Sequence, residues 1–90
     1  MNKKLEKVLK DANTEIIKKK FFNNFQINIH GDFKNEYNEI ILSAKDGYHN
    51  FPIAWAETEG EAIAAINAYM AGLRHGKSNS YPKICDEENS

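Results

Sequence analysis

The sequence predicts an α+β domain in two layers, with two helices covering one face of a three-stranded antiparallel meander, in the order helix–strand–strand–strand–helix. Three observations predict this class. Apolar residues recur with the period of a helix near both ends of the chain. Between these ends they recur with the two-residue period of strands, and turn residues separate three such runs. Ninety residues are enough for one domain of this kind.

The first apolar pattern predicts one amphipathic helix within the first twenty residues. Asn13 and Thr14 are weak helix formers, but the apolar stripe keeps its phase across them, so we expect a single helix. Lysines and acidic residues occupy the opposite face. The stripe consists of Leu5, Val8, Leu9, Ala12, Ile16 and Ile17.

Three strands are expected next, over residues 25–30, 37–44 and 49–55. A turn at Asp46-Gly47 joins the second and third strands. We expect the apolar sets of the two strands to meet on one buried face, with Leu42 opposite Phe51 and Ile40 opposite Ile53. On the third strand this face would carry His49, Phe51, Ile53 and Trp55.

Pro52 constrains the loop of this hairpin. In a two-residue loop Ile41 and Pro52 would form a hydrogen-bonded pair, but proline has no N–H to donate. A four-residue loop over residues 45–48 moves Pro52 to a non-bonded position. We therefore predict the longer loop, or a bulge at Pro52, rather than a tight two-residue turn.

The last helix is predicted by its start and its end. Thr58 and Glu61 fit a capping box, and Gly76 follows as the C-terminal cap. Residues 1–76 are therefore expected to form the single domain, and the polar residues 77–90 a flexible C-terminal tail. The helical stripe consists of Ala62, Ile63, Ile66, Tyr69, Met70 and Leu73.

The charges are distributed unevenly, although the formal net charge is only −1. Residues 1–20 carry seven lysines against three acidic residues, a balance of +4. Residues 31–61 carry two lysines against seven acidic residues, a balance of −5. Such a dipole can steer docking to a partner. Arg74 is the one arginine, which counts against a protein that reads guanine with forked guanidinium groups.

Localisation is predicted from apolar runs and from cysteine usage. No stretch approaches the roughly 20 apolar residues of a membrane-spanning helix. The lysine-rich start has no continuous apolar region of the kind found in signal peptides. The single cysteine, Cys85, cannot form an internal disulfide, which fits a reducing compartment. We therefore expect a cytoplasmic protein.

Catalytic and metal-binding patterns are missing from the sequence. It contains no paired metal spacing such as H-x-x-x-H or C-x-x-C, no glycine-rich phosphate loop and no nucleophile elbow. A metal or general-base site would need His30, Asp32 and His49 to converge, and a structural role for these residues is the preferred interpretation. We expect no enzymatic activity and no cofactor.

The function favoured by these features is a small, non-catalytic protein–protein interaction module. The sheet face opposite the helices should be open and carry a mixture of aromatic and short polar side chains. Abundant Lys, Asn, Ile and Phe are typical of AT-rich genomes, so an inhibitor or regulator of a host protein, encoded by a phage or mobile element, is one form of this hypothesis. A homodimer through an edge strand is an alternative. The candidate contact residues are Tyr37, Ile41, Tyr48, His30 and Asn50.

The competing function is nucleic-acid binding through Lys18, Lys19 and Lys20, at the end of the first helix. The predicted order of elements resembles that of double-stranded RNA-binding domains. That resemblance implies lysines at the start of the last helix. Here the corresponding segment, residues 57–61, carries three glutamates, which would repel phosphate.

Overall fold

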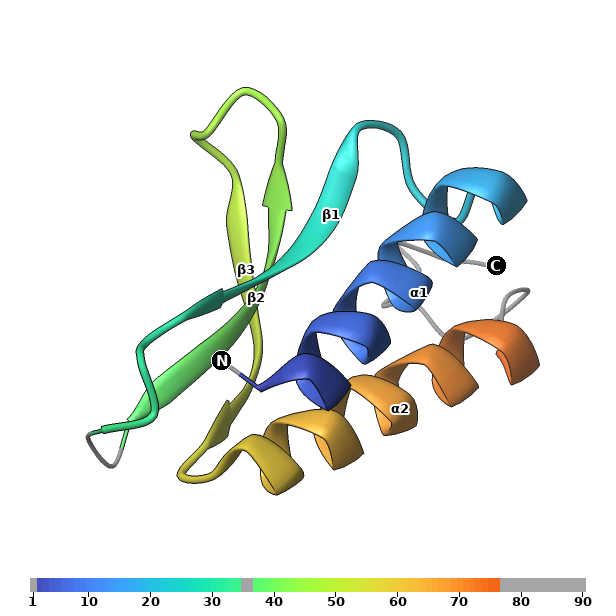
Figure 1. The fold of residues 1–90 in the computed structure, drawn as a ribbon. Helices are drawn as coiled ribbons and strands as arrows, with labels where there is room; N and C mark the ends of the chain where they lie inside the picture. Colours follow the sequence, from blue (N-terminus) through green and yellow to red (C-terminus); the bar gives the residue numbers. More distant parts are fainter. Residues whose placement is uncertain (1, 35–36, 77–90) are drawn as a thin grey trace.

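The predicted class is confirmed in the computed structural model, which describes residues 2–34 and 37–76 (Figure 1). Two helices lie side by side against one face of a three-stranded antiparallel sheet of order β1-β2-β3. The predicted C-terminal tail, residues 77–90, lies outside the described residues. The elements are α1 (Lys3–Lys19), β1 (Phe25–His30), β2 (Asn38–Ala44), β3 (Asn50–Ala56) and α2 (Glu59–His75).

Helix α1 is a single helix, as predicted, with a defined cap at each end. At its start the Asn2 side chain accepts a hydrogen bond of 2.8 Å from the Leu5 N–H. At its end Lys20 adopts the left-handed conformation, with φ of 56°, and the Phe21 N–H donates to the Ile16 carbonyl at 3.1 Å. These contacts form a Schellman motif, which satisfies carbonyls of the last turn.

Helix α2 begins with the predicted capping box. The Thr58 hydroxyl accepts from the Glu61 N–H at 3.1 Å, and the Glu61 carboxylate reaches back to accept from the Glu57 N–H at 2.7 Å. At the other end the Gly76 N–H donates to the Gly72 carbonyl at 2.8 Å. Sequence-local hydrogen bonds therefore define both ends of this helix.

The core lies between the helices and the sheet. Helix α1 packs on β1, α2 packs on β3, and the two helices pack on each other. The central strand β2 supplies Ile40 and Leu42 to this layer, and β1 supplies Ile27. The helices contribute the remaining large buried side chains, Leu5, Ile16, Ile66, Met70 and Leu73.

The hairpin between β2 and β3 contains both features that Pro52 suggested. The Ala44 N–H donates to the His49 carbonyl at 2.8 Å, which leaves the four-residue loop 45–48. The register then shifts: Ile41 lies opposite Pro52, but Ile40 lies opposite Ala54, so Ile53 is an extra residue.

This bulge corrects two of the predicted positions. Ile40 does not lie opposite Ile53, and Trp55 does not lie on the helix-covered face. One extra residue reverses the alternation of every side chain that follows it in the strand. Trp55 therefore lies opposite Glu39, on the face away from the helices, and Ala54 takes its place toward the core.

A buried asparagine fixes the connection between β1 and β2. Asn38 is 0% exposed; its Oδ1 accepts from the Phe33 N–H at 2.9 Å and its Nδ2 donates to the Ala56 carbonyl at 3.0 Å. Gly31 lies directly against this side chain with φ of +141°. A Cβ atom at Gly31 would lie 2.2 Å from the Asn38 Oδ1, so only glycine fits there.

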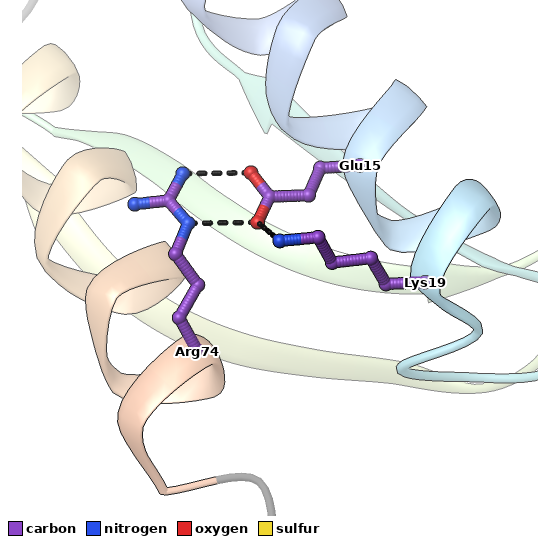
Figure 2. Close-up of polar contacts among 3 residues, drawn as sticks. All are labelled: Glu15, Lys19 and Arg74. Atoms are coloured by element: carbon purple, nitrogen blue, oxygen red, sulfur yellow. Dashed lines mark hydrogen bonds and ion pairs between the residues drawn. The ribbon is translucent and has the colours of Figure 1, made fainter.

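An ion-pair cluster joins the two helices (Figure 2). The Arg74 guanidinium donates two hydrogen bonds of 2.7 Å to the Glu15 carboxylate, and Lys19 approaches the same carboxylate at 3.2 Å. The hydrogen bonds from Arg74, together with Lys19, lower the pKa of Glu15 from 4.5 to about 2. The cluster thus ties the C-terminal end of α2 to the C-terminal part of α1.

We expect Glu15→Gln to lower the melting temperature by about 2–6 °C at pH 7. The folded-state pKa of Glu15 lies below the ordinary value of 4.5, so the stabilisation is complete above that pH and is lost as the pH falls toward 2. The difference between the thermal melts of the two proteins should therefore shrink steadily from pH 5 to pH 3. Asp11→Asn, which removes the exposed Lys7 pair within α1, is the control and should have a smaller effect. A difference independent of pH would contradict this role for Glu15.

Candidate protein-interaction surface

The sheet face opposite the helices, called the open face below, consists of three cross-strand rows. The register pairs define these rows, because residues directly opposite one another in an antiparallel sheet point to the same side. The first row is Gln26, Ser43 and Asn50; the second is Asn28, Ile41 and Pro52; the third is His30, Glu39 and Trp55.

The structure brings together three of the five predicted contact residues. His30 and Asn50 are exposed on the open face. Ile41 lies in the row between them but is only 2% exposed, so it offers a partner almost no contact area. Tyr37 and Tyr48 are 77% and 87% exposed. They lie beyond opposite ends of β2, whose seven residues span roughly 24 Å, and therefore belong to no single cluster.

Trp55 is the main surface residue that the sequence prediction missed. It is 61% exposed on the open face, whereas the prediction placed it on the helix-covered face and expected Tyr37 and Tyr48 to be the aromatic residues of the open face. A signal was available in Pro52, because a bulge at that position moves Trp55 to the other face. The exposed indole makes the third row the most apolar part of the open face to which a partner has access.

Glu39 lies directly opposite Trp55, and cross-strand neighbours have Cβ atoms about 5 Å apart. Its side chain is half-buried, yet its carboxylate makes no hydrogen bond or ion pair with any residue in 2–34 or 37–76. The other two half-buried carboxylates of these segments are both paired. Glu15 binds Arg74, and Glu59 accepts from the Asn2 N–H and side-chain amide at 2.6 and 2.9 Å.

Each free edge of the sheet has one position at which strand addition is blocked. On β1, the Asn13 side chain accepts from the Ile27 N–H at 2.6 Å and donates to the Ile27 carbonyl at 3.0 Å. On β3, hydrogen-bonded and non-hydrogen-bonded pairs alternate, starting from the bonded pair Ala44 and His49, so Pro52 is in a non-hydrogen-bonded position opposite Ile41. The Pro52 nitrogen therefore faces the free edge, and proline has no N–H to donate there. This geometry disfavours the alternative of a homodimer through an edge strand.

The three lysines of the nucleic-acid hypothesis lie at the C-terminal end of α1 and are exposed. Lys19 is already paired with Glu15, and Lys20 forms the left-handed cap. The carboxyl end of a helix carries partial negative charge, which attracts lysine and repels phosphate. Lys18 lies in the same last turn of the helix.

The structure does not bring together His30, Asp32 and His49, the residues that a metal or general-base site would need. His30 ends β1, opposite Glu39, whereas His49 lies beside the hairpin loop and contacts Asp46 at 3.0 Å. Asp32 accepts from the Lys34 N–H at 2.9 Å, as a turn residue does. Within residues 2–34 and 37–76, no group of three His, Cys, Asp or Glu side chains could hold a metal ion.

A second apolar area lies at the hairpin end of the sheet. Phe25 contacts Phe22 and Phe51, with ring centroids 6.1 and 5.9 Å apart. Phe51 is partly exposed, but its ring packs within this cluster, and Phe22 and Phe25 pack against the core. The area therefore extends the core.

Comparison of the chain with protein-family models, with curated proteins and with solved structures finds no match. Among the described residues no helix has the length and apolar character needed to cross a membrane. The candidate site consequently depends on its own geometry: an exposed indole directly opposite Glu39, a half-buried residue whose carboxylate has no partner in the described segments.

Proposed function

We propose that this protein is a non-catalytic interaction module that binds another protein through the open face of its sheet. The exposed Trp55 carries the proposal. Tryptophan is the residue type most enriched at the energetic centres of protein interfaces, because burying its large ring contributes more than burying any other side chain. Both helices lie on the same face of the sheet (Figure 1), and the register places Trp55 on the opposite face.

The surroundings of Trp55 support an interface of ordinary composition. The row next to that of Trp55 carries Asn28 and Pro52 beside the buried Ile41, and the row beyond it carries the polar residues Gln26, Ser43 and Asn50. An apolar centre within a polar rim is the usual arrangement of a non-obligate interface. A module of this size acts on its partner by occupying a surface, so we propose an inhibitory or regulatory role. We place it in the cytoplasm, where the lone cysteine stays reduced.

Trp55→Ser is expected to weaken partner binding at least tenfold, as loss of a central interface tryptophan does. The measurement is affinity capture from lysate of a low-GC bacterium, after nuclease treatment, followed by titration of the captured protein. Ile17→Ser is the matched control, because Ile17 is 62% exposed, close to the exposure of Trp55, but lies on α1. Thermal melts of both variants verify that they are folded.

Two results would contradict the proposal. In the first, Trp55→Ser captures the partner as well as the unchanged protein does. In the second, nuclease abolishes capture, and replacing Lys18, Lys19 and Lys20 by glutamine also abolishes it. That second result would establish nucleic-acid binding through α1, whose affinity should also fall steeply with salt.

A further inference from the structure

We propose that the partner presents an arginine side chain, which stacks on the Trp55 ring and pairs with the Glu39 carboxylate. This inference rests on the proposed function of the open face and adds the chemistry of its ligand. It starts from the pairing of Glu39 and Trp55 across β2 and β3. The two side chains are direct cross-strand neighbours on the same side of the sheet.

The unpaired carboxylate restricts what can cover this face. Glu39 is half-buried in the central strand and has no partner in the described segments, 2–34 and 37–76. A protein that docks over Trp55 removes water from this carboxylate. Burial of a charged group without a compensating partner is strongly unfavourable, so the docking surface has to supply a cation or several hydrogen-bond donors.

Trp55 restricts the choice further. The face of an indole ring attracts cations, most strongly when water is excluded. Arginine satisfies both neighbours at once, because its planar guanidinium stacks on an aromatic ring while its edge donates two parallel hydrogen bonds to a carboxylate. Lysine offers a compact, strongly hydrated charge that cannot stack in this way.

The remaining charges on the open face favour an incoming cation. None of its three rows contains lysine or arginine, and His30 is the one basic side chain among them. Glu39 is the one acidic side chain in the three rows. This arrangement attracts a basic surface and repels phosphate, so this face suits a protein and not a nucleic acid.

Trp55 is the one tryptophan of the chain, so its fluorescence reports on this site. The probes are three capped tripeptides, acetyl-Gly-X-Gly-amide, where X is arginine, lysine or citrulline. Citrulline keeps the shape of arginine without its charge. We expect the arginine peptide to change Trp55 fluorescence saturably with a Kd on the order of 10 mM. Lysine should bind about threefold more weakly, and citrulline about tenfold more weakly.

Glu39→Gln should weaken binding of the arginine peptide about three- to tenfold. Glu6→Gln is the control, because Glu6 is an exposed glutamate on α1. Equal responses to arginine and citrulline, no saturable response to arginine, or no effect of Glu39→Gln would each overturn the inference. The peptide comparison uses the unchanged protein, so it holds even if a variant is unstable. If the peptide experiments fail while Trp55→Ser still weakens capture of a protein, this inference is wrong and the proposed function stands. The two experiments therefore test the two proposals separately.

Discussion

Asn38→Ala is expected to lower the free energy of unfolding by about 3–5 kcal/mol. The change removes the acceptor of the Phe33 N–H and the donor to the Ala56 carbonyl. A buried backbone group left without a partner costs about 1–3 kcal/mol, and the cavity left by the side chain adds to this. A 90-residue domain has about 5–13 kcal/mol of total stability, so a large share would be lost.

Urea denaturation followed by far-UV circular dichroism measures this effect. Asn50→Ala is the matched control, because Asn50 lies exposed on the neighbouring strand β3. Its loss should change the free energy of unfolding by less than about 0.5 kcal/mol. If Asn38→Ala costs less than about 1 kcal/mol, then water or other donors replace both hydrogen bonds, and the asparagine does not hold the β1–β2 connection.

Gly31→Ala should destabilise the protein by at least about 3 kcal/mol. Two causes act together at this position. The backbone has φ of +141°, which a residue with a Cβ atom rarely adopts. The new Cβ would also lie 2.2 Å from the Asn38 Oδ1 and 2.9 Å from its Cβ, so Asn38 would have to move out of its hydrogen bonds.

Gly72→Ala provides the opposite expectation within the same chain. Gly72 lies in α2, and nothing lies within 4 Å of a Cβ built there. Alanine should therefore stabilise the helix by about 0.5–1 kcal/mol. Melting temperatures of the two variants should shift in opposite directions. A Gly31→Ala protein as stable as the unchanged one would show that the connection between β1 and β2 can rearrange.

The parts of the fold that sequence reasoning predicted are those set by neighbouring residues. The capping box of α2 involves residues three and four apart, and the four-residue hairpin loop follows from one proline. The single helix α1 follows from the phase of its apolar stripe. In each case the physical cause lies within a few positions along the chain, so the sequence displays it directly.

The parts that sequence reasoning did not predict depend on contacts between distant residues. Asn13 was noted as a weak helix former, but its contact with Ile27, fourteen residues away, can be seen only after α1 docks. The buried role of Asn38 likewise depends on Ala56, eighteen residues away. Asparagine is typical of loops and surfaces, so residue type alone gives no indication of burial.

The candidate site was predicted in part. The sequence indicated that the face away from the helices would be open, and His30 and Asn50 lie on it. It did not identify Trp55, because the face of that residue depends on where the bulge in β3 falls. It did not identify Glu39 either, because the pairing of Glu39 with Trp55 depends on the same bulge. Pro52 was expected to require either a longer loop or a bulge, whereas the structure has both. A single inserted residue determines which side of the sheet receives the tryptophan.

The Asn13 side chain covers the β1 edge only when α1 lies on the sheet, because both of its hydrogen bonds to Ile27 cross from helix to strand. A chain in which the strands have paired but α1 has not docked exposes unpaired backbone groups in an apolar strand, which is a template for aggregation. Chain order reduces this risk during synthesis. Helix α1 precedes β1 in the sequence and leaves the ribosome first, so the cover is present before the edge that it protects.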